Sequence, residues 1–477
     1  MLTYGHFNTI HPGHIRYLRN ARTLGEKLVV ALIGDASDAF QFNQQERAEA
    51  LSLLGLADGV LLLNADELGD AIQQLKPTDL VLGNEFKQQQ GIQSSLTLQR
   101  SRGGSVHFHA GEVHYASTDL LKGSENELQS KRNDQFAAAC KRQGIDQQQL
   151  LNSIDCWSTT RLMVLGDTIV DQYAACEAIG MSAEAPVVVV RELEERNYIG
   201  GAAVVAAHIR ALGAQCDLVS VVGNDSTACL VKEALAEQQI GDAMTTDPTR
   251  PTTLKKRYLV DNQKLFRVSR LEEHNIDTSI EAQLINQIEV LAPKVKGIVV
   301  SDFVYGVVTP KILDVVHDVA KKHKLMLFGD LQCSSQMGSV TRFQNFSLLC
   351  PNEREARLAL QDKNSGIEQI SQEVLKQSHC KRLLMKLGSE GFIAYDRDNN
   401  NKISSQAFPA LSVNPVDVTG AGDSLLAVMA TGLASGQEMM PTAALACCMS
   451  KLAVKAMGNT PISSSKLRGC LKDVMNN

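Results

Sequence analysis

The sequence predicts an α/β protein with two domains, and three observations support this prediction. The chain has 477 residues, which is enough for two or three domains that each bury a core. Short apolar runs alternate with helical periodicity in residues 1–122, as in a doubly wound domain around a parallel sheet. A glycine-rich segment, Asp417–Asp423, opens an apolar helix far along the chain. We therefore expect an N-terminal domain at residues 1–122, a linker with helices at 123–158, and a second α/β domain at 159–477.

The composition is that of an ordinary globular protein, with 44% hydrophobic and 21% charged residues. The formal net charge is −6, and no basic run is long enough to indicate nucleic acid or a membrane surface as a partner. The first residues resemble neither a signal peptide nor a transit peptide, and no apolar run approaches the roughly 18 residues of a membrane span. The 11 cysteines are scattered without a Cys-x-x-Cys pair. We expect a cytoplasmic protein with reduced thiols.

The N-terminal domain is predicted from alternating strands and helices. A strand at Leu2–Tyr4 leads into a turn rich in glycine and histidine, and a helix begins near Pro12, a residue suited to the first helical position. Leu28–Ile33 is apolar throughout, as expected for a strand of a buried parallel sheet. The further predicted helices and strands are Glu46–Leu54, Gly59–Leu63, Asp66–Leu75, Leu80–Leu82 and Val106–Phe108. In such folds the ligand lies at the carboxyl ends of the strands, where His11 and His14 would be found.

Two histidines at a helix start can stabilise negative charge on a phosphate group in transfer, although a surface loop could equally contain them. The run Gly5–His14, with Gly-x-Phe and His-x-Gly-His, and the segment Ala116–Leu121 resemble the nucleotidyltransferase (cytidylyltransferase-like) family. Arg47 falls where that family has a helix arginine. The resemblance implies that catalysis is carried by His11 and His14 and that nucleotide is bound by Gly5, Phe7, Ser117 and Thr118.

Two departures from that family leave the activity of the N-terminal domain open. Asn8 stands where the family usually has an aspartate, and Ala36–Phe42 lacks the family's phosphate-binding lysine. The loss of a cation from a site that handles a triphosphate weakens transition-state stabilisation. A metal site is a separate possibility, since His107 and His109 would share one face of a strand. Because no third ligand is fixed by spacing, solvated histidines are the favoured interpretation.

Residues 123–158 are polar and charged, which predicts a linker with one or two helices, the last of them capped by Asp146. Beyond it, two segments alternate apolar and polar residues in the manner of strands, Pro186–Arg191 and Leu254–Arg270. The other predicted strands are Arg161–Gly166, Lys296–Ser301, Leu325–Gly329, Ser347–Cys350 and Arg382–Lys386. Helical segments lie between them, so the second domain is also α/β.

Two places in the second domain have residues suited to a sugar. Asp171 comes shortly after the strand Arg161–Gly166, and a carboxylate there can accept hydrogen bonds from two sugar hydroxyls. A helix cap is the alternative, and it fits Asp167 better than Asp171. Gly200 and Gly201 begin a helix, and paired glycines let a ligand lie against the backbone.

The segment Asp417–Asp423 carries the strongest signal for a reaction. Its glycines and alanine let backbone N–H groups at a helix start approach a ligand, and the helix dipole adds positive potential, which suits a phosphoryl group in transfer. Asp423 lies in the first turn, where its carboxylate could take a proton from an attacking hydroxyl. The segment is not a dinucleotide fingerprint, because Leu425 occupies the place of the third glycine. It is not a Walker loop either, because no Gly-Lys-Ser/Thr follows.

Asp-x-x-Gly-Ala-Gly-Asp at a helix start resembles the signature of the ribokinase-like (PfkB) sugar kinases. The resemblance implies a small β-sheet lid over the site, ATP as a substrate and Mg²⁺ as a cofactor. It assigns catalysis to Asp423, phosphate and nucleotide binding to Gly420, Ala421, Gly422, Lys386, Gly388 and Gly391, sugar binding to Asp171, Gly200 and Gly201, and magnesium binding, through water, to Asn352 and Glu355.

Ser182–Val187 and Ser301–Phe303 look like the bifunctional heptose-7-phosphate kinases/heptose-1-phosphate adenylyltransferases of lipopolysaccharide core synthesis, with the domain order reversed. That resemblance implies a sugar phosphate and a nucleoside triphosphate as partners and an activated sugar such as ADP-heptose as product. Tyr305 and Gln332 stand where that family has lysines, and Val204 replaces an asparagine. Each change removes a polar group that could hold the sugar, so the sugar stays open.

Three hypotheses follow for the whole chain. The first is a sugar or sugar-phosphate kinase coupled to a nucleotidyltransferase. The second is a kinase with a degenerate transferase domain that only binds nucleotide or mediates assembly, and Asn8 with the missing lysine keeps it open. The third is a non-catalytic nucleotide-sensing protein, against which Asp423, Asn352 and Glu355 argue. The sugar, the nucleoside triphosphate of the first domain and the formation of a homo-oligomer are left open.

Overall fold

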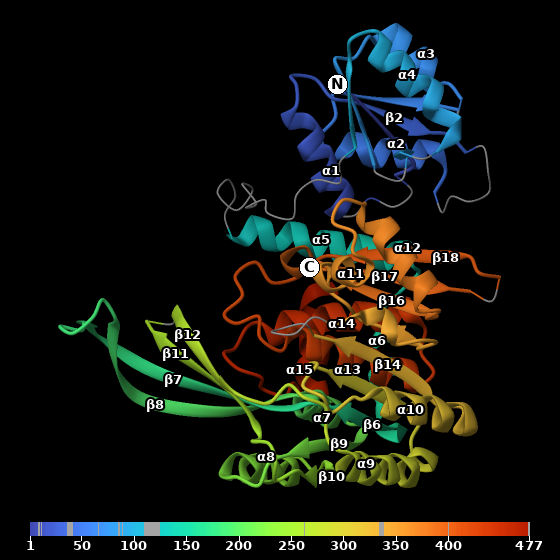
Figure 1. The fold of residues 1–477 in the computed structure, drawn as a ribbon. Coiled ribbons are helices and arrows are strands. Elements are labelled where there is room, and N and C mark those ends of the chain that lie inside the picture. Colours follow the sequence, from blue (N-terminus) through green and yellow to red (C-terminus); the bar gives the residue numbers. More distant parts are fainter. Residues whose placement is uncertain are drawn as a thin grey trace.

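The structure is a computed structural model (Figure 1). It describes residues 1–7, 10, 12–35, 42–64, 66–83, 86–87, 89–108, 125–261, 263–332, 338–398 and 400–475. Several residues singled out above lie outside the described residues, namely Asn8, His11, most of Ala36–Phe42, His109, Ser117 and Thr118. Within the described ranges, no helix is long and apolar enough to cross a lipid bilayer.

The N-terminal domain is a parallel five-stranded sheet with helices on both faces, as predicted. Its strands, in the order β3-β2-β1-β4-β5, are β1 (Leu2–Gly5), β2 (Val29–Ile33), β3 (Gly59–Leu63), β4 (Asp79–Leu82) and β5 (Ser105–Phe108). Its helices are α1 (Pro12–Thr23), α2 (Gln44–Leu53), α3 (Leu68–Leu75) and α4 (Gln93–Ser101). Leu18 and Leu51 pack α1 and α2 on one face, and Ile72 and Leu96 pack α3 and α4 on the other. The strand order changes direction between β1 and β4, which is where a doubly wound sheet binds its ligand.

Helix α2 begins at Gln44, earlier than the predicted Glu46, because Asn43 caps it. The Asn43 side chain accepts the N–H groups of Gln45 and Glu46 at 3.0 Å each. Glu46 in turn accepts the Asn43 N–H at 3.0 Å, which completes a capping box.

The predicted linker contains two helices, α5 (Glu125–Arg142) and α6 (Gln147–Asp155). Asp146 caps α6 as expected, accepting the Gln149 N–H at 2.7 Å. Both helices pack on the second body rather than standing apart from it. Phe136 of α5 and Leu150 of α6 are fully buried in its hydrophobic core, and Figure 1 shows α5 lying across that body.

The second body is built on a nine-stranded sheet in the order β10-β9-β6-β13-β14-β15-β16-β17-β18, in which β17 runs antiparallel to its neighbours β16 and β18 and the other pairs are parallel. Its strands are β6 (Arg161–Gly166), β9 (Gln215–Val222), β10 (Gly241–Thr246), β13 (Gly297–Asp302), β14 (Met326–Leu331), β15 (Leu348–Leu349), β16 (Arg382–Lys386), β17 (Phe392–Arg397) and β18 (Ile403–Phe408). Its helices are α7 (Ala202–Ala211), α8 (Ser226–Glu237), α9 (Thr278–Leu291), α10 (Pro310–His323), α11 (Glu353–Leu360), α12 (Ile367–Gln377), α13 (Ala421–Ala434), α14 (Met439–Ala453) and α15 (Ser464–Met475). One core lies on the side of α7, α13 and α14, and a second lies on the side of α9, α10 and α12.

A separate four-stranded sheet projects from this body as the expected lid (Figure 1). Its order is β12-β11-β7-β8, from β7 (Thr168–Met181), β8 (Val188–Gly201), β11 (Thr253–Val260) and β12 (Gln263–Arg270). Its surface is unusually apolar for an exposed sheet, with exposed Ile179, Met181, Val188 and Leu193 on β7 and β8 and exposed Phe266 and Val268 on β12. Its near end joins the body at the residues predicted to bind sugar.

Candidate active site

The start of α13 has the geometry expected of an anion-binding helix N-terminus. Gly420 caps the helix in the left-handed region, with φ +76°. A Cβ there would lie 2.1 Å from the side-chain oxygen of Asn459, so both conformation and space require glycine. The helix that follows is buried and so held in one orientation. The N–H groups of its first turn, which have no partner within the helix, therefore all face one place.

Asp423 lies in the first turn of α13 and is only 4% exposed. Its Oδ1 accepts a hydrogen bond from Gln332 Nε2 at 2.8 Å. Burial raises the pKa of Asp423 to about 7, and the negative charges of Asp330 and Asp171 add to that rise against the opposing charge of Lys386. A carboxylate with a pKa near neutrality is well matched to general-base catalysis.

Lys386 supplies a cation beside this helix start. Its Nζ donates to both carboxylate oxygens of Asp330 at 2.8 Å each. Burial alone would lower the pKa of Lys386, but the charges of Asp330 and Glu355 raise it, so the ammonium stays charged. Gly388 and Gly391 shape the turn after Lys386, with φ of +61° and +96°. The turn conformation by itself accounts for these two glycines.

We expect Gly422→Val to lower turnover by about 10²-fold or more while the fold survives. A Cβ at Gly422 would lie 3.3 Å from Lys386 Nζ and 3.8 Å from Asp330 Oδ2, so a branched side chain fills the space where backbone and ammonium meet a phosphate. ADP release and the thermal midpoint without ligand measure the two effects. Gly422→Ala is the matched control and should lose less activity. If the valine variant unfolds, the glycine has a structural role and the prediction fails.

The predicted sugar residues lie together at the base of the lid. Asp171 is 4% exposed, and its Oδ2 accepts a hydrogen bond from Asn459 Nδ2 at 2.9 Å. Its Oδ1 accepts a hydrogen bond from Arg257 Nη1. A Cβ at Gly200 would lie 2.6 Å from Asp171 Oδ2, and one at Gly201 would lie 2.2 Å from a backbone oxygen. The paired glycines therefore let the chain pass close beside the carboxylate.

Sequence reasoning missed Asn459 and Arg257. Asn459 follows α14 and has no motif around it, yet its side chain lies between Asp171 and Gly420 and so joins the sugar side to the helix start. Arg257 lies in the predicted lid strand. The alternation of apolar and polar residues predicted the strand but did not indicate which of its faces meets the site. No signal in the sequence would have identified either residue.

Asp167 is not a helix cap, which was the alternative role that the sequence suggested for it. Its Oδ2 accepts the Phe303 N–H at 2.7 Å, and its Oδ1 accepts the Val307 N–H at 3.4 Å. Burial and the nearby charge of Asp302 raise the pKa of Asp167 to about 7. Asp167 thus holds the loop after β13, in which Val304 has the strained φ of +62° for a β-branched residue.

Asp417 ties the lid to the segment that precedes α13. It accepts hydrogen bonds from Lys264 Nζ of β12 and from the Tyr173 hydroxyl of β7, both at 2.8 Å. Burial would raise the pKa of Asp417, but these bonds and that of Thr419 hold it well below its usual range. The ionised carboxylate is therefore a fixed contact between lid and helix start.

Asn352 and Glu355, predicted to bind magnesium through water, form the capping box of α11. The Glu355 N–H donates to Asn352 Oδ1 and the Asn352 N–H donates to Glu355 Oε2, each at 2.8 Å. In the part of the chain that the structure describes, no three His, Cys, Asp or Glu residues are grouped to hold a metal ion. Any Mg²⁺ here would take most of its ligands from water and phosphate oxygens, which is the usual way this ion is bound.

The predicted nucleotidyltransferase residues that are described begin at Gly5, the last residue of β1, and continue beyond it. Phe7 is buried with φ +45°, and its ring centroid lies 5.1 Å from that of His14. Arg47 is 1% exposed and donates to the backbone oxygens of His6 and Ile33, so it holds two loops together. A Cβ at Gly5 would lie 3.0 Å from the Phe7 ring.

The histidine at position 107 is not isolated in solvent. Its Nε2 lies 2.9 Å from Asp79 Oδ1 on the neighbouring strand, and this pairing accounts for the side chain without a metal.

Helix α1 also meets the second body. Arg16 Nη2 donates to Glu353 Oε2 at 3.0 Å, and His14 Nε2 lies 3.7 Å from Glu368 Oε2. Glu353 directly follows Asn352, so the predicted catalytic helix of one domain contacts the segment predicted to bind magnesium in the other. The contacts are between charged side chains, and the hydrophobic cores of the two bodies are separate.

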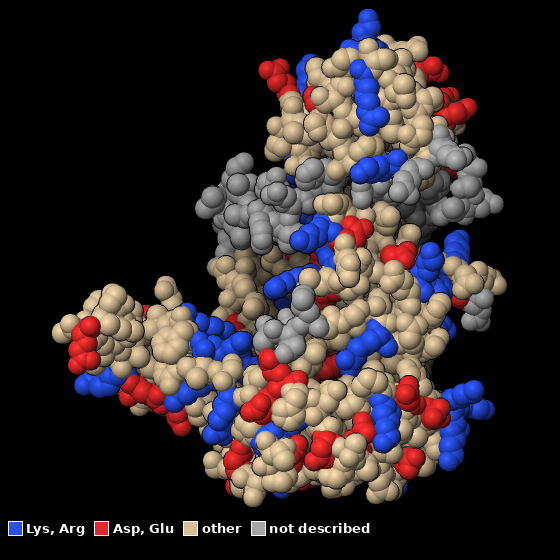
Figure 2. Space-filling view, in the orientation of Figure 1, with Lys and Arg blue, Asp and Glu red and all other residues tan. Residues whose placement is uncertain are grey.

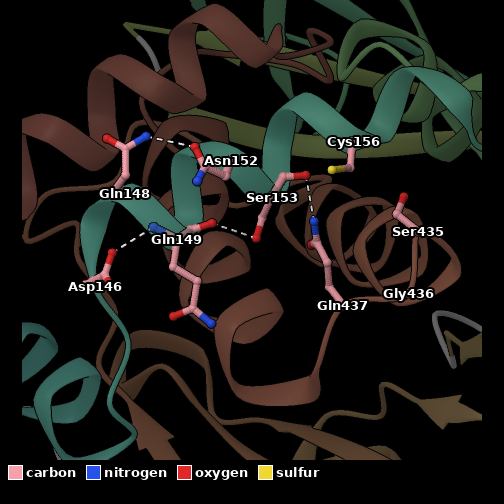
Figure 3. Close-up of a pocket in the computed structure, with 9 residues that line it drawn as sticks. All are labelled: Asp146, Gln148, Gln149, Asn152, Ser153, Cys156, Ser435, Gly436 and Gln437. Atoms are coloured by element: carbon pink, nitrogen blue, oxygen red, sulfur yellow. Dashed lines mark hydrogen bonds between the residues drawn. The ribbon is translucent and has the colours of Figure 1, made fainter.

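A surface hollow of about 560 Å³ lies over α6 and the carboxyl end of α13, the end opposite Asp423 (Figure 3). Several of its polar side chains are bonded within the local structure. Gln148 Nε2 donates to Asn152 Oδ1 at 2.8 Å, and Gln437 Nε2 donates to the Ser153 carbonyl at 2.6 Å. No nucleophile and base face each other there, so this hollow is not the candidate site.

Two family models match the chain. The pfkB family carbohydrate kinase model matches residues 159–466, and the cytidylyltransferase-like model matches residues 2–126. Among curated proteins, the chain is 30% identical over 315 residues to the bifunctional protein HldE of Trichlorobacter lovleyi, covering 65% of this chain and 62% of that protein. It is 32% identical over 311 residues to HldE of Campylobacter jejuni serotype O:6, covering 65% and 64%. The chain thus aligns with less than two thirds of the length of these relatives, and its domain order is reversed.

Two solved structures share the fold of the second body. Phosphofructokinase-2 from Escherichia coli in complex with substrates and products has a TM-score of 0.55 at 16% identity, covering 66% of this chain and 99% of its own. Arabidopsis thaliana ribokinase complexed with ribose and ATP has a TM-score of 0.52 at 21% identity, again covering 66% and 99%. At these identities the likeness concerns the fold, and it confirms the predicted α/β body with its small lid sheet.

Proposed function

Because the chain belongs to the pfkB family of carbohydrate kinases, we propose that it transfers the γ-phosphoryl group of ATP to a hydroxyl of a sugar phosphate resembling heptose 7-phosphate. We further propose that its cytidylyltransferase-like domain transfers a nucleotidyl group from a nucleoside triphosphate to a sugar 1-phosphate and releases pyrophosphate. The product would be an activated sugar such as ADP-heptose. The observation that carries the kinase proposal is the buried Asp423 beside Lys386 at the start of α13.

The kinase step follows from the positions of these groups. Asp171 receives hydroxyls of the sugar, and Asp423 takes the proton from the attacking hydroxyl as its oxygen bonds to the γ-phosphorus. The bond from that phosphorus to the bridging oxygen breaks, and ADP leaves. The N–H groups from Gly420 to Gly422 and the Lys386 ammonium stabilise the charge on the phosphoryl oxygens. Asn352 and Glu355 would hold Mg²⁺ through water, and the ion would neutralise phosphate charge.

The nucleotidyltransferase step rests on fewer described residues. His14 lies at the start of α1 beside the carboxyl end of β1, which suits a group that stabilises phosphate charge. The alternative is an active kinase whose N-terminal domain only binds nucleotide. Two observations favour that alternative. Asn8 and the missing lysine depart from the pattern of the family. Arg47 already donates its hydrogen bonds to backbone oxygens and to Asp35.

One experiment separates these functions. Purified protein is incubated with ATP or another nucleoside triphosphate and a panel of sugars, sugar phosphates and sugar 1-phosphates, while ADP and pyrophosphate are followed separately. We expect ADP release with a sugar phosphate and pyrophosphate release with a sugar 1-phosphate. ADP without pyrophosphate under any condition would support the alternative, and the absence of both would overturn the proposed function.

We expect kcat/KM of the kinase to rise with pH and to level off above about pH 7. The Asp423 carboxyl must be ionised to accept a proton, and burial raises its pKa to about 7. An exposed aspartate would already be ionised throughout the neutral range and would give no rise there. ADP release measured across pH 5.5–9 gives the midpoint. Gln332→Leu removes a donor that favours the ionised form and should move the midpoint upward; a flat profile in both proteins would contradict the assignment.

A further inference from the structure

Asn459, in the loop after α14, is a buried amide that bonds to the carboxylate proposed to receive the sugar. It is 5% exposed, and its Nδ2 donates to Asp171 Oδ2 at 2.9 Å. No donor among the described residues bonds to its Oδ1. A buried polar atom without a partner costs free energy, so its presence needs an explanation other than stability.

The orientation of this amide follows from the chemistry of its partner. An ionised carboxylate only accepts hydrogen bonds, so the NH₂ end of Asn459 must face Asp171. Reversal of the amide would place two oxygens in contact. Oδ1 therefore lies on the opposite side, beside Gly420, where a Cβ on that glycine would meet it at 2.1 Å. One side chain thus contacts both the proposed sugar carboxylate and the residue that caps α13.

Asn459 and Arg257 hold different oxygens of the same carboxylate. Arg257 Nη1 donates to Asp171 Oδ1, and Asn459 Nδ2 donates to Oδ2. A carboxylate oxygen has two lone pairs, so each oxygen keeps one for a hydroxyl. Because both oxygens are held, the plane of the carboxylate cannot rotate, and the remaining lone pairs have fixed directions.

The neutrality of Asn459 suits this arrangement. Figure 2 shows Lys and Arg side chains gathered where the lid joins the body, and Arg257 already balances the charge of Asp171. A second cation on Asp171 would compete strongly with sugar hydroxyls for its lone pairs, because hydrogen bonds between charged groups are the stronger ones. An amide holds the carboxylate in place and leaves it a good acceptor.

The loop that carries Asn459 is itself fixed at two places. The Gly458 N–H donates to Asp417 Oδ2 at 3.4 Å, just before α13. The Ile462 N–H donates to His208 Nδ1 of α7 at 3.3 Å. Asn459 lies between these two anchors, so its side chain projects from a rigid support, as the positioning of another group requires.

On the basis of the proposed kinase function, we infer that Asn459 is a positioning residue, which fixes the orientation of the Asp171 carboxylate and sets it in place relative to the start of α13. The acceptor hydroxyl meets the phosphoryl group only if these two places keep their relative position, and Asn459 contacts both. Asn459 acts through Asp171 and not on the reacting atoms.

The kinetic test replaces Asn459 with aspartate, which has the same shape but no N–H group. At pH 8 an ionised carboxylate would face Asp171 and turn it away. With sedoheptulose 7-phosphate or fructose 6-phosphate as acceptor, Asn459→Asp should raise the acceptor KM by at least about tenfold. The KM for ATP should stay within about twofold, since an oxygen still lies beside Gly420. Thr460→Ala, at the exposed neighbouring position, is the matched control and should change neither KM.

The pH dependence distinguishes positioning from a merely structural role. Two carboxyl groups in contact share a proton, and the shared O–H can donate as the amide did. The acceptor KM of Asn459→Asp should therefore return towards that of the unmodified protein as pH falls from 8 to 5.5. The charged groups nearest the pair are Arg257 of β11, Asp423 of α13 and Asp417 before α13. All three are present in both proteins, so the ratio of the two KM values is the quantity to compare.

A stability test does not depend on turnover. The thermal midpoint of Asn459→Asp should fall more steeply between pH 6 and pH 8 than that of the unmodified protein. The folded pair binds a proton that the unfolded chain releases, so stability is lost as pH rises through the raised pKa of the pair. The exchange variant, Asp171→Asn with Asn459→Asp, again places one amide beside one carboxylate. It should lose the additional pH dependence, and its kinase activity should not return.

Asn459→Ala removes the donor without adding a charge, and it serves if the aspartate variant does not fold. It should raise the acceptor KM at every pH, because one hydrogen bond to a charged group is lost. An acceptor KM within about twofold of the unmodified protein would overturn the inference.

The tests separate failure of the inference from failure of the proposed function. If no sugar is phosphorylated by any protein, the proposed function fails, while a pH-dependent midpoint that the exchange variant abolishes still supports the positioning of Asp171 by Asn459. If the kinase is active but Asn459→Asp raises the acceptor and ATP KM values equally, the role of Asn459 is structural and the inference is overturned. An increase in acceptor KM that is the same at pH 5.5 and pH 8 overturns it too.

Discussion

Asp423→Asn should lower the kcat of the kinase by about 10²–10⁴-fold while ATP still binds, because the variant loses the proton acceptor at the helix start. Asparagine has the shape of aspartate, and its Oδ1 can still accept the hydrogen bond from Gln332. The N–H groups and the Lys386 ammonium remain in place, so nucleotide binding is retained. ADP release and calorimetric titration with ATP measure the two properties.

The stability of this variant distinguishes lost chemistry from lost folding. The folded-state pKa of Asp423 is raised to about 7, so the folded protein is destabilised as pH rises through that value and the carboxyl ionises without adequate solvation. Asparagine removes this charge. The thermal midpoint of Asp423→Asn at pH 8 should therefore equal or exceed that of the unmodified protein. Near-normal ADP release by the variant would refute the assignment of Asp423 as base.

His14→Ala should abolish pyrophosphate release and leave ADP release unchanged. The imidazole lies at the start of α1, where it can stabilise the charge of a nucleotide phosphate, and its loss removes that stabilisation at one site only. Asp423→Asn should give the reverse result when a sugar 1-phosphate is supplied directly. Separate hydrophobic cores make such independence the expected result, since distant sites usually behave additively.

The contact of His14 with Glu368 calls for a control. Glu368→Gln removes the charge that His14 meets at 3.7 Å and leaves the imidazole in place. We expect this variant to release both ADP and pyrophosphate at nearly normal rates. If Glu368→Gln and His14→Ala both impair the kinase, the contact couples the two domains and independence is wrong. If the unmodified protein releases no pyrophosphate, the N-terminal domain is a transferase fold without its chemistry.

The elements of the fold were predictable where local signals agree with tertiary packing. β3, β6 and β16 have the predicted limits because apolar strands end at turn residues. The start of α2 was placed too late because the capping role of Asn43 was not recognised. A helix cap was the alternative role considered for Asp167, whereas its partners are the N–H groups of Phe303 and Val307, more than a hundred residues away.

The sequence by itself determined the α/β class, the two family resemblances and the placement of Asp423 in the first turn of a glycine-capped helix. These features depend on residues close together in the chain, because periodicity, capping and glycine conformation are local properties. Only the tertiary structure decided that Asn459 joins Asp171 to Gly420, that Gln332 donates to Asp423, and that the Lys255 ammonium lies over the Tyr305 ring. The raised pKa of Asp423 was also decided only by the tertiary structure, since it is set by burial and by charges from other strands. Contacts and desolvation of this kind depend on which distant segments the fold brings together, and no spacing along the chain encodes them.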